Sequence, residues 1–223
     1  MINTLLFIVL PYVALILLLL GSIYRYRFNR FTVSSLSSQF LEGKELFYGS
    51  VPFHWGLVFL FFGHLIAFLF PRSVIAWNGI PARLFILEIA AFSFGLLTLS
   101  GLIMLVARRV NTTKLYPVTS KMDVLVYMIL LVQVITGLWT AVGYRWGSSW
   151  FASVLSPYLK SIFVFNPDIA SVSAMPLIIK IHIVSAFVLV GMVPFTRFMH
   201  FLVFPFTYIW RRYQVVIWNK KQA

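Results

Sequence analysis

Apolar residues run along the chain in five long stretches, and short polar or basic segments separate each stretch from the next. Each stretch approaches the roughly 20 residues that an α-helix needs to cross the hydrocarbon core of a bilayer. The pattern therefore predicts an all-α membrane protein with five transmembrane helices, organised as a single domain over residues 1–223. The expected helices cover approximately residues 3–24, 52–70, 83–107, 122–143 and 176–206.

Prolines and one long loop refine this pattern. Pro52, Pro81 and Pro176 stand near the expected helix starts, where the missing N–H of proline does no harm. Pro194 lies inside the fifth stretch and should kink that helix. The longest loop, residues 144–175, carries an apolar pattern from residue 150 to residue 159 that favours a short amphipathic helix in the membrane interface.

Composition agrees with a membrane protein. The chain is 61% hydrophobic and only 10% charged, whereas a soluble domain carries roughly a quarter charged residues. There is no cysteine, which excludes disulfides and cysteine-ligated zinc or iron–sulfur clusters within this chain. Any iron–sulfur cluster would belong to a partner. The first stretch lacks a basic segment before it and is too long for a cleavable signal peptide.

The net charge of +13 might suggest nucleic acid, but the basic residues are spread over the connections between the apolar stretches. Thirteen of the 18 lysines and arginines fall on one side of a five-helix arrangement. Because basic residues accumulate in cytoplasmic loops, we expect the N-terminus outside and the C-terminus in the cytoplasm. Membrane lipid rather than nucleic acid is the expected partner of this charge.

All four histidines of the chain lie in two of the apolar stretches: His54 and His64 in the second, His182 and His200 in the fifth. An ionisable side chain at membrane depth is costly and suggests function. Two pairs of imidazoles on two helices are suited to clamping two haems, with each iron held from both sides. Such ligation leaves iron no open position, so the haems would carry electrons rather than bind oxygen.

Antiparallel packing of the second and fifth helices pairs these histidines by depth. His54 comes level with His200 near the cytoplasmic side, and His64 comes level with His182 nearer the outside. In continuous helices the two spacings, ten and eighteen residues, correspond to about 15 Å and about 27 Å. Tilt and the expected kink at Pro194 have to absorb that difference.

Small residues near the histidines allow two interpretations. Gly63, next to His64, and Gly95 and Gly101 in the third stretch would let a flat macrocycle approach the backbone. Alternatively they serve close helix–helix packing, which is the commoner use of glycine in membrane helices.

A set of short motifs accompanies the histidines over nearly the whole chain. In these motifs and in their order, the chain resembles the gamma (cytochrome b) subunit family of membrane-bound respiratory nitrate reductases. The motifs are Pro11-Tyr12, Gly21-Ser22, Arg25-Tyr26, Ser37-Ser38-Gln39, Phe53-His54-Trp55-Gly56, Gly63-His64, Arg108-Arg109, Asp123, Leu131-Val132-Gln133, Gly137-Leu138, His182, Pro194 to His200, Pro205, Tyr208, Arg211 and Tyr213-Gln214.

The resemblance implies a five-helix anchor in the cytoplasmic (inner) membrane of a bacterium or archaeon, with helices II–V forming a bundle around two b haems. His54 and His200 would be the axial iron ligands of the cytoplasm-side haem, and His64 and His182 those of the outer haem. Quinol would be oxidised near the outer haem. Electrons would then pass inward to an iron–sulfur (beta) subunit and to a molybdenum-cofactor (alpha) subunit that reduces nitrate.

Three further residues become candidates in this setting. Arg83 matches a basic residue of the family's quinol site, although arginine does not release its proton. Glu88, a little over one turn deeper, would accept a quinol proton if burial favoured its neutral form; otherwise it is an acid placed near a helix N-terminus. Arg197, three residues before His200, is predicted to bind a propionate of the cytoplasm-side haem, or else to anchor the helix at the membrane surface.

Two other functions stay open on the sequence alone. The first alternative is the cytochrome b subunit of a different quinone-linked reductase, of the heterodisulfide or sulfite type, because the substrate chemistry lies on another subunit. A haem-free transporter that uses histidines for ions or protons is the alternative of another class. Such a transporter would be expected to carry acids within its spans, and only Glu88 and Asp123 come close.

Overall fold

The computed structural model describes residues 1–29 and 44–202, and within these ranges the regular structure is helical throughout. Five of its helices are long and apolar enough to cross a membrane, which confirms the five predicted spans. The first span is built from α1 (Ile2–Thr4), α2 (Leu10–Ile16) and α3 (Ser22–Phe28), joined by π-helical turns. The others are α4 (Lys44–Leu69), α6 (Pro81–Asn111), α7 (Lys121–Gly143) and α11 (Leu177–Met192).

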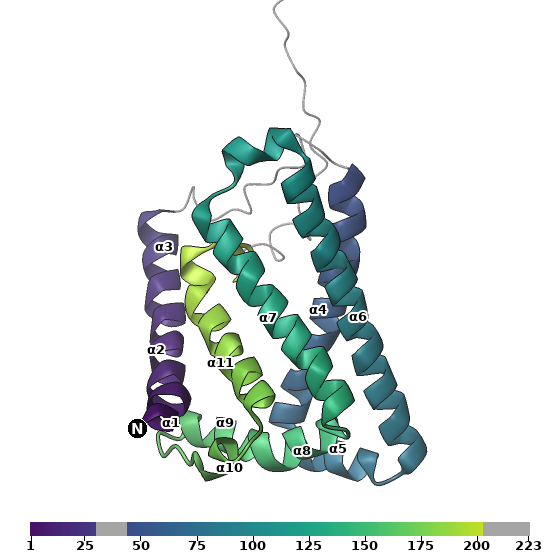
Figure 1. Ribbon diagram of the computed structural model, residues 1–223. Coiled ribbons are helices and arrows are strands. Elements are labelled where there is room, and N and C mark those ends of the chain that lie inside the picture. The colour runs from purple at the N-terminus through teal and green to yellow at the C-terminus, as the bar shows by residue number, and fades with distance from the viewer. Residues whose placement is uncertain (30–43, 203–223) are drawn as a thin grey trace, which may run out of the picture.

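Successive spans along the chain run alternately up and down (Figure 1). The first span packs against α11, α11 against α7, α7 against α6, and α6 against α4. The helices α4, α6 and α7 share an apolar core, which includes Phe53, Leu102 and Leu130. We call the end of the bundle where α4 begins and α6 ends the upper end, as Figure 1 shows it.

Glycines bring α4 and α6 into close contact. A Cβ atom on Gly56 would lie 2.7 Å from the carbonyl oxygen of Phe94, and one on Gly101 would lie 2.7 Å from that of Gly49. No real Cβ tolerates such distances, so these positions require glycine. Close approach through small residues is how membrane helices gain packing energy where lipid is as apolar as their own side chains.

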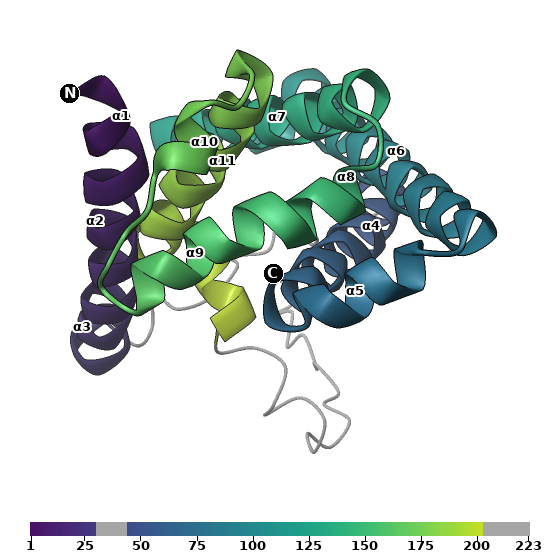
Figure 2. The ribbon, with the colours of Figure 1, turned by 90° about the horizontal axis from the view of Figure 1, so that it is seen from below.

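Short helices cover the lower end of the bundle. They are α5 (Pro71–Asn78), α8 (Gly147–Trp150), α9 (Ser156–Phe163) and α10 (Ala170–Ser173). A π-helical turn over Phe151–Leu155 joins α8 to α9, and α9 lies across the ends of the spans (Figure 2). The helix predicted within residues 150–159 is therefore present and extends on both sides of that segment.

Buried side chains of α9 fasten it to the spans. Tyr158 is 2% exposed, and its hydroxyl donates to the carbonyl oxygen of Phe7 at 2.8 Å. Burial raises the pKa of the Tyr158 phenol, so the group stays protonated and remains a donor. Ser156 donates to the carbonyl oxygen of Ala67 at 3.0 Å. The covering segment is thereby tied to both the first span and α4.

Two predicted boundaries differ from the structure. Helix α4 begins at Lys44, so Pro52 lies inside it rather than near its first turn. The fifth span does not continue as one kinked α-helix: α11 ends at Met192, two 3₁₀ turns follow, and Thr196 between them is extended. Pro194 supplies part of the reason because it cannot donate to the helix ladder. The predicted end of this span near residue 206 lies outside the described residues.

Candidate functional site

The structure brings His54 of α4 close to His200, which follows the fifth span, at the upper end. Their ring centroids are 6.3 Å apart, and the ring planes make an angle of 71°. His54 is exposed and His200 half-buried in the chain alone. Two imidazoles that are 146 positions apart in the sequence are therefore close together in space. The antiparallel packing of the second and fifth helices predicts that these two residues lie at the same depth.

Hydrogen bonds to the backbone fix the protonation pattern of three histidine rings. In each, Nδ1 lies 2.7 Å from a carbonyl oxygen within the same turn of the chain. A carbonyl only accepts, so Nδ1 is the donor in each of these contacts, and Nε2 is the ring nitrogen left for a further partner. This is the outer hydrogen bond that metal-ligating histidines make. The pairs are His54 with Ser50, His64 with Leu60, and His200 with Arg197.

The distance between His54 and His200 fits a metal held between them. A metal–imidazole bond of about 2.0 Å on each side, plus about 1.2 Å from each nitrogen to its ring centre, gives a centroid separation of about 6.4 Å. The observed value is 6.3 Å. Within residues 1–29 and 44–202 no group of three or more His, Cys, Asp or Glu side chains is placed to hold a metal ion. Two imidazoles at this separation could hold one metal ion from two sides.

His182 lies deeper in the bundle, between α11 and α7. Its Nδ1 lies 3.0 Å from the carbonyl oxygen of Gln133 and 3.2 Å from Oγ1 of Thr136. The Gln133 amide nitrogen lies 3.2 Å from the Nε2 atom, and Ser185 donates to the Gln133 amide oxygen. A Cβ atom on Gly137 would lie 2.9 Å from His182 Cε1, so glycine makes room for the ring.

His64 faces the lower end of the bundle. It is exposed in the chain alone, and its ring stands perpendicular to that of Phe151, with centroids 5.3 Å apart. His64 and His182 are near enough to interact electrostatically. On the sequence, Gln133 appears only within the motif Leu131-Val132-Gln133, without a role, and Thr136 is not named. A polar amide in an apolar span was the available signal.

Gly63, Gly95 and Gly101 were predicted either to make room for a flat macrocycle or to serve helix packing, and they differ in their surroundings. Gly101 packs against the backbone of α4 and Gly95 against Leu138, so helix packing accounts for both. A Cβ atom on Gly63 would meet nothing within 4 Å. Because Gly63 also precedes His64 on an exposed part of α4, its proposed role beside a flat cofactor stays a prediction.

Arg83 and Glu88 lie near the lower end of α6. The Arg83 guanidinium stands 4.9 Å from the centre of the Trp77 ring of α5. One carboxylate oxygen of Glu88 accepts from the backbone N–H of Ser148 at 2.9 Å and from its hydroxyl at 2.6 Å. Glu88 therefore joins α6 to the start of α8, and the quinol roles of both residues stay predictions.

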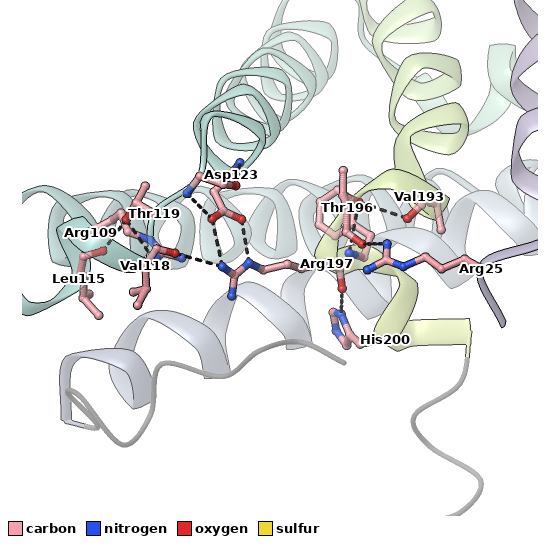
Figure 3. A network of polar contacts seen from close by, with 12 residues as sticks. Arg25, Arg109, Leu115, Val118, Thr119, Asp123, Val193, Thr196, Arg197 and His200 are labelled. Atoms are coloured by element: carbon pink, nitrogen blue, oxygen red, sulfur yellow. Dashed lines mark hydrogen bonds and ion pairs between the residues drawn. The ribbon is translucent and has the colours of Figure 1, made fainter. Parts of the chain in front are cut away.

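Arg197 has a protein partner in the structure (Figure 3). Its Nε donates to Asp123 Oδ1 at 2.8 Å, and its Nη2 donates to Oδ2 at 3.2 Å. Nη2 also donates to the carbonyl oxygen of Val118 at 3.1 Å. The prediction of a propionate contact stays untested, whereas the side chain that Arg197 binds within the protein is the carboxylate of Asp123. On the sequence, Asp123 stands as one of the family motifs and as an acid near a span end, without a partner.

Five apolar spans, with the rings of His54 and His200 brought close together at one end, define the chain as a multi-pass helical membrane protein with a candidate cofactor site. Sequence comparison gives the particular family: the model of the nitrate reductase gamma subunit matches residues 3–219. The chain therefore belongs to the nitrate reductase gamma subunit family. It is a membrane subunit of an oxidoreductase, nitrate reductase.

Individual relatives agree over almost the full length. The nitrate reductase gamma chain of Bacillus subtilis (strain 168) is 32% identical over 217 residues, which cover 96% of both chains. The respiratory nitrate reductase 2 gamma chain of Escherichia coli (strain K12) is 30% identical over 219 residues, again 96% of both. The nitrate reductase-like protein NarX of Mycobacterium tuberculosis (strain CDC 1551 / Oshkosh) is 28% identical over 218 residues, 33% of its own length.

Proposed function

We propose that this chain is the di-haem cytochrome b subunit that oxidises quinol and passes the electrons across the membrane to cytoplasmic partners. Residues 1–223 would form one such domain, with α4, α6, α7 and α11 around the two haems. The observation that carries the proposal is the facing pair His54 and His200, with both Nδ1 atoms held by backbone carbonyls and ring centres 6.3 Å apart.

The histidine residues would hold the two haems at two levels. His54 and His200 fit the upper group, and the lower group would take His64 and His182, with Gly63 beside it. When bound, each haem would accept and donate single electrons, so the two would connect the two faces of the bilayer. At the lower site the backbone carbonyl of Gln133 and the hydroxyl of Thr136 would orient the His182 ring through Nδ1, as partners of ligating histidines do. The side-chain amide of Gln133, which contacts Nε2, would have to give way to the iron.

The quinol site would lie at the lower end, near His64. Oxidation of quinol yields quinone, two electrons and two protons. Arg83 would bind a quinol oxygen through its fixed positive charge, and Glu88 would accept a proton. With the lower end outside the cell, protons would leave outward while electrons move inward, which builds a transmembrane potential without a proton channel.

The partners follow from the same proposal. The chain has no cysteine, so an iron–sulfur (beta) subunit would receive the electrons at the cytoplasmic face and pass them to a molybdenum-cofactor (alpha) subunit that reduces nitrate. The membership in the nitrate reductase gamma family supports this choice over heterodisulfide- or sulfite-type reductases. It also supports an electron carrier over a haem-free transporter. We place the complex in the cytoplasmic (inner) membrane of a bacterium or archaeon.

Redox titration of the purified complex tests the proposal. The wild type should show two low-spin haems of b type. His54→Ala or His200→Ala should remove one of them, and His64→Ala or His182→Ala should remove the other. Phe61→Ala, on an exposed part of α4, is the control and should retain both. A wild-type complex without b-type absorption, or retention of both haems in all four histidine variants, would reject the proposal.

A further inference from the structure

The chain segment that delivers His200 is not helical, and side chains from the first span hold it on one side. Thr196 is buried and extended, with φ −122° and ψ −179°. Arg25 of α3 donates from Nη1 to the carbonyl oxygens of Pro194 and Thr196, both at 2.8 Å. A Cβ atom on Gly21 would lie 2.8 Å from Pro194 Cγ, so the first span is in direct contact with the non-helical segment.

The start of α7 holds the same segment on the other side. Arg197 donates two hydrogen bonds to the Asp123 carboxylate, whose side chain is only 9% exposed. Asp123 is itself fixed by the α7 capping box: Oδ2 accepts from the N–H of Ser120 at 2.9 Å. A two-pronged guanidinium–carboxylate pair sets direction as well as distance. Breaking it would leave a charge largely buried, which is costly.

The segment connects these anchors to the imidazole. The carbonyl oxygen of Arg197 accepts from Nδ1 of His200 at 2.7 Å. Arg197 therefore holds Asp123 with its side chain and the His200 ring with its backbone (Figure 3). Any rotation of the Arg197 peptide would turn the ring away from His54.

We propose that Arg25 and the Asp123–Arg197 ion pair form a clamp that positions the His200 imidazole opposite His54 for ligation. Arg25, Asp123 and Arg197 are positioning residues in this role, since they act through the backbone of residues 194–197. The inference rests on the proposed function, because the geometry matters for a haem held at that site. It assigns Arg197 to Asp123 rather than to a propionate.

The test compares the midpoint potentials and low-spin electron paramagnetic resonance signals of the two haems in the intact complex. The variants are Asp123→Asn, Arg197→Gln and the double variant that combines them. Asparagine keeps an acceptor for the Ser120 cap while losing the charge. The double variant keeps the net charge of the wild type but lacks the ion pair. Lys121→Gln, which removes an exposed charge at the same end of α7, is the matched control.

The clamp predicts that the double variant changes the reduced-to-oxidised ratio of the His54–His200 haem about tenfold at the wild-type midpoint, equivalent to 59 mV for one electron. Its low-spin signal should move as well, while the other haem and the Lys121→Gln variant stay unchanged. Arg197→Lys, which keeps the charge but loses the two-pronged geometry, should shift the same haem by a smaller amount.

A purely electrostatic effect gives a different pattern: the two single variants shift the potential in opposite directions, and the double variant returns to the wild-type value. That pattern would overturn the clamp. Should the double variant fail to assemble, Arg25→Ala decides the question, because it removes both hydrogen bonds to the carbonyl oxygens of Pro194 and Thr196. An unchanged signal in Arg25→Ala also overturns the clamp. Absence of two low-spin haems in the wild type rejects the proposed function instead.

Discussion

The four histidines differ in how their ring nitrogens are engaged. In His54, His64 and His200 a nearby backbone carbonyl accepts a hydrogen bond from Nδ1, which leaves Nε2 as the nitrogen that could bind a metal. His182 is surrounded by α7, which contributes the Gln133 amide and the Thr136 hydroxyl. The sequence revealed the histidines because they are conspicuous in apolar helices. It could not reveal their partners, which lie on other helices.

Glu88 offers a test at the scale of one residue. Glu88→Gln keeps an oxygen that accepts from Ser148, so the connection between α6 and α8 should survive. If Glu88 takes a quinol proton, this variant should lower kcat for quinol oxidation by about 100-fold, the lower range for acid–base catalysis. Stopped-flow reduction of the haems by a quinol analogue measures it.

The matched control for Glu88 is Ser148→Ala. This variant removes the hydroxyl hydrogen bond but leaves the carboxylate, and we expect kcat to fall less than the Glu88→Gln value. Equal losses in the two variants would show that Glu88 only fastens α6 to α8.

At the scale of helices, the apolar stretches predicted all five spans, because the length of an apolar run is a local property. Two helix boundaries depend on contacts with other parts of the chain and were not predicted. Helix α4 continues upstream of Pro52 to Lys44, since proline within a long helix is tolerated where neighbours pack around it. In the fifth span, Pro194 alone predicted a kink. In the structure the α-helix ends at Met192, and Arg25 and Asp123 bind the non-helical segment that follows.

Gly101 provides the test at this scale. A methyl group from Gly101→Ala would overlap the backbone of α4 near Gly49 and Phe53. We expect a loss of about 1–3 kcal/mol in the free energy of unfolding, as overpacking costs. Thermal unfolding of the purified complex in detergent measures this loss. Gly143→Ala is the control, because its Cβ would meet Trp139 at an ordinary 3.5 Å; equal unfolding temperatures would contradict the packing argument.

At the scale of the whole molecule, the distribution of charge and the alternation of the spans define two unlike faces. The upper end carries the ends of α3 and α6 and the starts of α4 and α7 (Figure 1). The lower end is covered by α5 and α8–α10 (Figure 2). Of the 13 lysines and arginines within the described residues, eight lie at the upper end and five at the lower end. We therefore propose that the upper end faces the cytoplasm and the partner subunits.

Reporter fusions test this orientation. Alkaline phosphatase, which is active only outside the cytoplasm, should be active when fused after Gly79 at the lower end. It should be inactive when fused after Thr112 at the upper end. A fluorescent protein that matures only in the cytoplasm should give the reverse pattern. Active phosphatase at Thr112 would invert the orientation and, with it, the proposed direction of electron flow.

The sequence alone determined the number of spans, their approximate limits and the histidines that they carry, because each depends on residues close together in the chain. Only the tertiary structure decided which rings meet and how the chain reaches His200. Those features depend on contacts between distant residues, 171 positions apart for Arg25 and Thr196 and 74 for Asp123 and Arg197. Hydrophobic periodicity carries no record of such pairs, since it specifies burial but not the partner.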